Sequence, residues 1–241
     1  MEISVVIPAY NEEKRIKPTL EKIGEYLSKN SKNYEIIVVN DGSKDNTNKV
    51  VLSLKNKKIR LINNEKNRGK GYSVKRGVLA SKYPLVLFSD SDLATPIEEI
   101  EKLKKHLENN EVVIASRNLK ESDIRIKQPI HRKLMGKLFS LLVRLVAVRG
   151  FKDTQCGFKL FKKEAAQKIF SLQTFERFSF DVEILFIAKK LKYKIKEVPV
   201  VWIDQKGSTV DPIKDSIKML LDLFKIRYNN LRGVYALSKT N

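Results

Sequence analysis

The chain has 241 residues, of which 42% are hydrophobic and 32% are charged, a balance that excludes a disordered protein and a polytopic membrane protein. It contains one cysteine, Cys156, so an intrachain disulfide framework is excluded and a reducing compartment is expected. The formal net charge of +20 favours a polyanionic partner such as nucleic acid, anionic lipid or nucleotide phosphate. The length suits one large α/β domain over residues 1–241.

The first half of the chain alternates short apolar strands with amphipathic helices. Strands are predicted at 3–7, 34–39, 59–62, 85–88 and 112–115, and the helices between them include 72–81 and 96–109. This alternation predicts a mostly parallel central sheet with helices on both faces. The first strand begins without a basic segment and an apolar segment before it, so we predict no signal peptide.

Polar residues follow four of the predicted strands: Tyr10, Asp41, Asp90 with Asp92, and Arg117. Because ligands bind beyond the carboxyl ends of parallel strands, we expect these residues to share one cleft. Asp90 and Asp92 flank a small residue, so both carboxylates can converge on one divalent cation, Mg²⁺ or Mn²⁺. On these residues alone, a solvated loop in which an aspartate caps the next helix remains the alternative.

Two apolar stretches in the second half carry basic residues on a separate face. The stretch 134–148 is too short and too charged for a transmembrane helix, which needs about 20 apolar residues. We expect membrane-interface helices at about 131–149 and 211–230, with an ordinary core helix as the alternative for 134–148. The remaining segments are predicted as loops at 118–133 and 153–159, a helix at 178–191 and a late strand at 195–203.

Four motifs stand out in the first half: Val5–Glu12, Val38–Ser43, Asn67–Gly71 and Asp90–Asp92. Together they resemble the inverting family 2 glycosyltransferases of the GT-A fold. Two later segments, Gly150–Phe161 and Arg177–Glu183, narrow the resemblance to the dolichyl-phosphate β-glucosyltransferases, relatives of the dolichyl-phosphate mannose synthases. The resemblance implies transfer of a hexose, glucose above all, from a UDP-sugar to dolichyl (polyprenyl) phosphate. The product would be β-linked and would serve glycan or protein N-glycosylation pathways.

The same resemblance implies residues for the donor side of the cleft. The nucleoside pocket would be lined by Pro8, Ala9, Tyr10 and Glu12. Asp41 would hydrogen-bond the uracil, and Lys70 would approach the nucleotide. Asp90 and Asp92 would bind Mg²⁺ or Mn²⁺, with Asp92 the more direct ligand, and Lys206 would cover the diphosphate.

On the acceptor side, the resemblance implies that Arg117 and Arg132 meet the acceptor phosphate. Asp153, Gln155 and residues 180–183 would form the sugar side of the cleft, where Asp153 and Gln155 help to bind the nucleotide sugar. It also implies a membrane-associated enzyme. Eukaryotic members carry an N-terminal transmembrane anchor, whereas this chain starts directly at the first strand. We therefore expect a peripheral protein at the cytoplasmic face of a membrane.

The role of Asp181 is open between two functions. A phosphate monoester has a second pKa near ~6, so it needs little help from a general base, and Asp181 would position the acceptor or the sugar. In a soluble glycosyltransferase that acts on a sugar hydroxyl, Asp181 would be the general base. UDP-N-acetylglucosamine and GDP-mannose are alternative donors. A nucleic-acid partner is not expected, because the basic residues are dispersed and the motifs are acidic.

Overall fold

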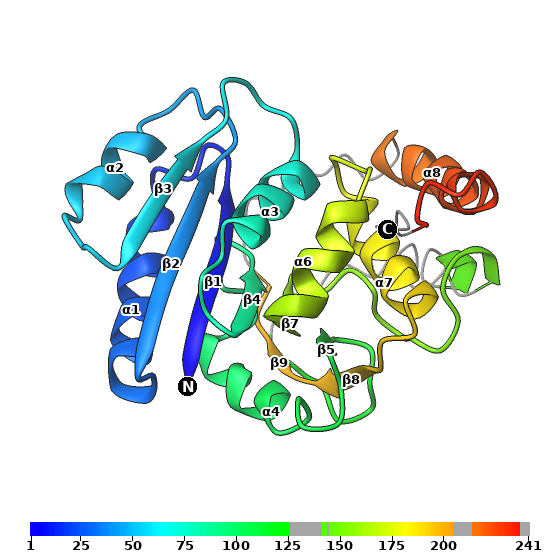
Figure 1. Ribbon diagram of the computed structural model, residues 1–241. Coiled ribbons are helices and arrows are strands. Elements are labelled where there is room, and N and C mark those ends of the chain that lie inside the picture. The colour runs from blue at the N-terminus through cyan, green and yellow to red at the C-terminus, as the bar shows by residue number, and fades with distance from the viewer. Residues whose placement is uncertain (126–140, 144, 205–213, 237–241) are drawn as a thin grey trace, which may run out of the picture.

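The computed structural model describes residues 1–125, 141–143, 145–204 and 214–236 (Figure 1). Its centre is a seven-stranded sheet with the order β3-β2-β1-β4-β7-β5-β8. The strands are β1 (Glu2–Ala9), β2 (Asn33–Asn40), β3 (Ile59–Asn63), β4 (Leu85–Ser89), β5 (Val112–Ser116), β7 (Phe158–Lys162) and β8 (Ile195–Pro199). All run parallel except β7, which lies antiparallel between β4 and β5. The predicted mostly parallel sheet is confirmed.

Helices cover both faces of this sheet. They are α1 (Ile16–Asn30), α2 (Thr47–Ser53), α3 (Lys70–Leu79), α4 (Ile100–Lys104), α6 (Lys163–Leu172), α7 (Phe180–Lys190) and α8 (Lys214–Leu231). One apolar core joins the sheet to α3, α6, α7 and α8, and the other joins it to α1, α2 and α4. Each strand of the sheet's centre is therefore buried on both sides, which explains its continuous apolar sequence.

The predicted helix 96–109 is shorter in the structure. A 3₁₀ turn (Ile97–Glu99) leads into α4, which ends at Lys104. The next turns close with bonds from His106 N to the Leu103 carbonyl (3.0 Å) and from Leu107 N to the Lys104 carbonyl (3.1 Å), three residues back. These tighter turns keep Leu107 buried, as its apolar spacing predicted, without continuing the α-helix.

The predicted strand 195–203 is divided between two sheets. β8 ends at Pro199, which has no N–H to donate, and β9 (Val201–Trp202) pairs instead with β6 (Asp123–Ile124) in a small parallel sheet. The prediction of a loop at 118–133 was therefore wrong at β6, and that of a loop at 153–159 was wrong at Phe158 and Lys159, which begin β7.

Two predicted residues, Arg132 and Lys206, lie outside the described residues. So do 126–133 of the predicted loop, 131–140 and 144 of the first predicted interface helix, and 211–213 of the second. The predicted helix 178–191 corresponds to α7, and the segment 211–230 corresponds to α8. Within the described part of the chain, no helix is both long and apolar enough to span a bilayer.

Candidate active site

Strands β1, β2, β4 and β5 run in the same direction and therefore end at the same edge of the sheet. Tyr10, Asp41, Asp90 and Arg117 each follow one of these strands. A backbone bond from Asp41 N to the Ala9 carbonyl (2.8 Å) continues the β1–β2 ladder to this edge. The fold thus brings the predicted strand-end residues to one side of the molecule.

Asp90 and Asp92 lie in the tight turn after β4. Asp90 N donates to the Gly157 carbonyl (3.0 Å), and the Asp92 carboxylate accepts a bond from Ala94 N (3.0 Å). Leu93 has a φ of 47°, a strained conformation for a residue with a side chain, and such strain is concentrated at functional turns. The turn is held by bonds on both sides, which fixes where the two carboxylates point.

Lysine side chains flank this acidic turn. Lys70, the first residue of α3, forms an ion pair with Asp90 (Nζ to Oδ1, 2.7 Å). Burial alone would lower the pKa of Lys70, but the carboxylates of Asp90 and Asp181 act in the opposite direction, and the pKa is raised. Lys70 therefore stays charged beside the acidic turn, where it can meet an anionic group.

A second lysine, Lys159, lies fully buried at the centre of the sheet. It pairs with Phe88 across the β4–β7 ladder, and its Nζ lies 5.6 Å from the Phe88 ring centroid. The ammonium donates to the Cys156 carbonyl (2.7 Å) and forms an ion pair with Asp181, at the N-terminal end of α7. Burial raises the pKa of Asp181, although Lys159 and Lys70 act against that rise. The Asp181 carboxylate is thus bound by Lys159, a partner that the sequence did not reveal.

Arg117 and Asp153 bind each other in a two-pronged ion pair. Arg117 donates from Nε (2.7 Å) and Nη2 (2.9 Å) to the Asp153 carboxylate, and its backbone N–H adds a third bond (2.9 Å). Burial would raise the pKa of Asp153, but Arg117 lowers it, and the pKa of Arg117 is raised in turn. Because a guanidinium has five N–H donors, Arg117 keeps donors for a phosphate while Asp153 fixes its orientation.

The Asp41 carboxylate organises the loop that leads into α3. It accepts bonds from Asn64 Nδ2 (2.6 Å), Arg68 N (3.0 Å) and Gly69 N (2.8 Å). Gly69 has a φ of 111°, and a Cβ there would approach the Glu176 carbonyl oxygen to 2.6 Å. Since a carboxylate offers about four lone pairs, these three bonds leave one acceptor position on Asp41.

The remaining predicted residues lie around these groups. Pro8 and Ala9 are buried at the end of β1, and Tyr10 is half-buried beyond them. Glu12 forms a two-pronged ion pair with Arg15 (2.7 and 2.8 Å), and the charge of Arg15 acts on Asp92. Gln155 lies on the loop before β7, where its backbone N donates to Asp153 (3.1 Å) and its side chain contacts Met219 of α8 (3.9 Å).

The two aspartates of the turn suit a divalent cation. Burial and the neighbouring Asp90 charge raise the pKa of Asp92, so a cation between the carboxylates would relieve their repulsion. A Cβ on Gly157 would lie 2.0 Å from Asp90 Oδ2, so the glycine leaves the carboxylate its space. In the described residues, no set of three or more His, Cys, Asp or Glu side chains could hold a metal alone. Phosphate oxygens and water would complete the shell, as Mg²⁺ commonly requires.

Comparison with known proteins agrees with this geometry. The family "Glycosyl transferase family 2" matches residues 4–170, which include the acidic turn, Lys70 and Arg117. The chain belongs to glycosyltransferase family 2. It is 41% identical to a dolichyl-phosphate beta-glucosyltransferase of Dictyostelium discoideum, with 97% of this chain and 76% of that protein covered. The human enzyme of the same name is 40% identical, with 99% and 79% covered.

Solved structures confirm the GT-A fold of this family member. Glucosyl-3-phosphoglycerate synthase from Mycobacterium tuberculosis, in complex with Mn²⁺, UDP-glucose and phosphoglyceric acid, superposes with a TM-score of 0.68 at 21% identity, covering 92% of this chain and 79% of that one. Mannosyl-3-phosphoglycerate synthase from Rubrobacter xylanophilus gives a TM-score of 0.62 at 18% identity, covering 100% and 77%. At these identities the structures establish the fold alone.

Lys159 and Arg15 are the charged side chains of this site that sequence reasoning missed. A lysine between Phe158 and Leu160 in an apolar strand was a usable signal, because lysine is almost never fully buried without a partner. The carboxylate it pairs with, 22 residues away, has no signal in the local sequence.

Proposed function

We propose that this chain is a dolichyl-phosphate β-glucosyltransferase, which transfers glucose from UDP-glucose to dolichyl phosphate. The observation that carries the proposal is the similarity to enzymes of that name over 97–99% of the chain, at 40–41% identity. That similarity extends beyond residue 170, into α7 and α8. The choice of acceptor, and not only the use of a nucleotide sugar, is therefore supported.

The donor would bind along the ends of β1 and β2. Pro8, Ala9 and Tyr10 would face the nucleoside, with Glu12 held beside them by Arg15. Asp41 would accept the uracil N–H on its free lone pair while it orders the loop before Lys70.

Departure of the diphosphate is the step that needs charge stabilisation. Asp90 and Asp92 would hold Mg²⁺ or Mn²⁺, which supplies a Lewis acid for the phosphate oxygens when it is bound. Lys70, now paired with Asp90 at 2.7 Å, would donate to the same diphosphate. Lys206, outside the described residues, is proposed to cover the diphosphate.

The acceptor phosphate would bind on the β5 side of the cleft. Arg117, oriented by Asp153, presents its remaining N–H donors, and Arg132 is proposed to assist from outside the described residues. Attack by the phosphate oxygen on the sugar face opposite the diphosphate would invert the anomeric centre. An α-linked donor would thus give the β-linked product.

Asp181 would position the substrates on the sugar side with Gln155. Its carboxylate is already bound by Lys159, and a phosphate monoester with a second pKa near ~6 is largely deprotonated at neutral pH. A general base is therefore not required for the reaction.

Attachment to a membrane follows from the acceptor. α8 exposes large apolar side chains, with exposed fractions of 65% at Leu221, 57% at Phe224 and 84% at Leu231. We propose that α8 and the segment at about 131–149 lie at the interface of a bilayer. The single, buried cysteine agrees with a reducing compartment and hence with the cytoplasmic face.

One assay tests this function. Purified protein is incubated with a short polyprenyl phosphate, Mg²⁺ or Mn²⁺, and each of UDP-glucose, UDP-N-acetylglucosamine and GDP-mannose. Glucose transfer to the lipid phosphate, and none to the matching polyprenol without phosphate, is expected. Preference for another donor would overturn the sugar assignment. Transfer to a soluble sugar hydroxyl instead of the lipid phosphate would overturn the acceptor and favour Asp181 as a base.

A further inference from the structure

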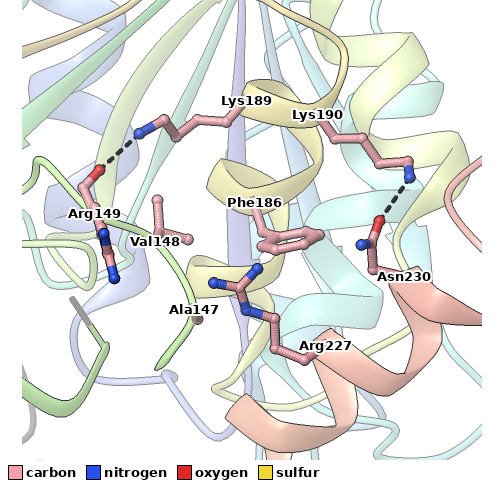
Figure 2. A pocket seen from close by; sticks show the side chains of 8 residues that line it. All are labelled: Ala147, Val148, Arg149, Phe186, Lys189, Lys190, Arg227 and Asn230. Atoms are coloured by element: carbon pink, nitrogen blue, oxygen red, sulfur yellow. Dashed lines mark hydrogen bonds between the residues drawn. The ribbon is translucent and has the colours of Figure 1, made fainter. Parts of the chain in front are cut away.

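A cationic cavity lies between the C-terminal end of α7, the segment 147–149 and α8. Its volume is about 400 Å³. Ala147, Val148 and Phe186 form its apolar wall, and Figure 2 shows basic side chains around them. At about 30 Å³ per water molecule, the space would hold a phosphate group together with several waters.

Basic side chains reach this cavity from three parts of the chain: Arg149, Lys189 and Lys190 of α7, and Arg227 of α8. Among the described residues that line the cavity there is no Asp or Glu, and none of the four cations forms an ion pair with the described part of the chain. The described lining of the cavity therefore offers four cations and no anion, a charge that complements an anionic ligand.

Hydrogen bonds orient three of these four cations around the cavity. Lys189 Nζ donates to the Arg149 carbonyl (2.8 Å), and Lys190 Nζ donates to Asn230 Oδ1 (2.6 Å). Arg227 Nε donates to the Val146 carbonyl (2.6 Å), and its guanidinium lies 5.5 Å from the Phe186 ring centroid (Figure 2). Each lysine uses one of three donors and the arginine one of five, so most donors remain for a ligand.

The helix dipole does not account for this arrangement. Lys189 and Lys190 are in the last turn of α7, where the dipole favours cations. Arg149 and Arg227 come from other segments and would be repelled by the two lysines. The cavity is also separate from the proposed active site, because eight residues, about 12 Å of α7, separate Asp181 from Lys189.

Exposed apolar residues of α8 run beside the cavity. Phe224, Tyr228 and Leu231 follow at intervals of four and three, so they form one stripe along the helix, and each is at least 57% exposed. Arg227 lies three residues after Phe224 and four before Leu231, spacings that place neighbours on a helix surface, so the cavity-lining face adjoins the stripe. An apolar stripe that inserts into lipid would place the cavity at the level of the headgroups.

We propose that this cavity binds the phosphate of an anionic phospholipid headgroup and so seats the protein on the bilayer. The proposal rests on the membrane partner given above, but not on the transfer reaction. Charge complementarity and the adjoining apolar stripe identify the occupant. The cavity would bind the headgroup of a lipid that is not a substrate, whereas Arg117 would bind the phosphate of the acceptor.

The test is flotation of the full chain with vesicles in the absence of any sugar donor. Vesicles of phosphatidylcholine alone are compared with vesicles that also contain phosphatidylserine. Each basic residue near an anionic surface contributes about 1 kcal/mol, or roughly fivefold in partitioning. Arg149→Gln with Arg227→Gln should therefore reduce binding to the anionic vesicles about 25-fold.

Two pairs of lysines serve as matched controls for the same loss of charge. Lys218→Gln with Lys225→Gln removes two exposed cations from α8 outside the cavity, and Lys49→Gln with Lys57→Gln removes two near α2, at the opposite end of the molecule from α8 (Figure 1). The Lys49 and Lys57 pair should lose less than about a third of the effect of the cavity pair on a logarithmic scale. The Lys218 and Lys225 pair, on the helix that we propose lies at the interface, measures the diffuse electrostatic loss that the cavity pair must exceed. Equal loss in the Lys218 and Lys225 pair would overturn the cavity in favour of diffuse attraction.

Arg227→Gln also removes a tether to Val146, so Arg149→Gln is measured alone. The Arg149 guanidinium has no hydrogen bond to the described residues, and its loss should reduce binding roughly fivefold with an unchanged melting temperature. Unchanged partitioning of this folded variant would overturn the proposal. Glucose transfer to a detergent-solubilised polyprenyl phosphate, assayed in parallel, shows whether the enzyme function holds independently.

Discussion

Gly157 provides a sharp test of the acidic turn, because it lies outside the Asp90–Asp92 motif. A Cβ at this position would approach Asp90 Oδ2 to 2.0 Å and Asp90 Cγ to 2.3 Å. That is more than about 1 Å closer than the ~3.3 Å of the shortest ordinary C···O contacts. Gly157→Ala must therefore displace the Asp90 side chain, since the backbone on both sides is held in the β4–β7 ladder.

The size of the effect follows from that displacement. A misplacement of about 1 Å in a catalytic constellation costs on the order of 100-fold in rate, which corresponds to about 2.7 kcal/mol of transition-state stabilisation. The added methyl group should also cost about 1–3 kcal/mol of stability through overpacking. The Lys70–Asp90 ion pair would be broken or stretched at the same time.

The assay measures kcat for glucose transfer against metal concentration, with Gly24→Ala as the matched control. Gly24 lies in α1, and nothing lies within 4 Å of the position that a Cβ would take there, so alanine should leave transfer unchanged and stabilise the helix by about 0.5–1 kcal/mol. We expect a large loss of kcat and a higher metal requirement for Gly157→Ala. A folded Gly157→Ala protein with normal kcat would refute the placement of Asp90 at the reacting groups.

Three further predictions concern charged groups. Asp92→Ala should abolish metal-dependent transfer. It should not lower the melting temperature, because it removes a carboxylate that Asp90 repels. Near-normal activity of this variant would contradict the metal assignment. Lys159→Met should cost about 3–5 kcal/mol in urea denaturation by leaving Asp181 unpaired, whereas Asp181→Asn should weaken transfer without abolishing it. Burial alone would raise the pKa of Glu35 in β2, but a hydrogen bond from Arg60 (Nη1 to Oε2, 2.6 Å) prevails, and the pKa is lowered. Its stabilising contribution is therefore present above the ordinary glutamate pKa of about 4.3 and is lost as the pH falls through the lower folded value, so Glu35→Gln should flatten the acid limb of stability against pH.

The strand-end residues could be predicted from the sequence because strand direction alone is enough to place them. Once β1, β2, β4 and β5 are assigned as parallel, Asp41, Asp90 and Arg117 must lie at one edge. Nothing about their side-chain partners enters that step. Strand direction also placed the turn after β4 at this edge, without deciding whether its aspartates bind a metal or cap a helix.

Partners across the chain could not be predicted in this way. Arg117 and Asp153 were assigned to different substrates, yet they bind each other across 36 residues. The insertion of β7 between β4 and β5 causes both this pairing and that of Lys159 with Asp181, because it brings the segment 153–159 beside the acidic turn. An antiparallel strand among parallel ones does not follow from the alternation of strands and helices. The two ion pairs that depend on β7 could therefore not be predicted from the sequence.

The same helix supports the proposed catalytic cleft and the proposed lipid cavity. Asp181 lies at the N-terminal end of α7 and Lys189 in its last turn, about 12 Å apart along the axis. Between them, Glu183 accepts bonds from Thr174 N (2.9 Å) and from the Tyr235 hydroxyl (2.8 Å), which ties the segment after α8 to the loop beside α3. A headgroup layer is roughly 5–8 Å thick on each side of a bilayer. If the cavity sits within that layer, Asp181 lies at most about 12 Å beyond it, or about two headgroup thicknesses, which limits how far a lipid phosphate must leave the membrane to reach the sugar side of the cleft.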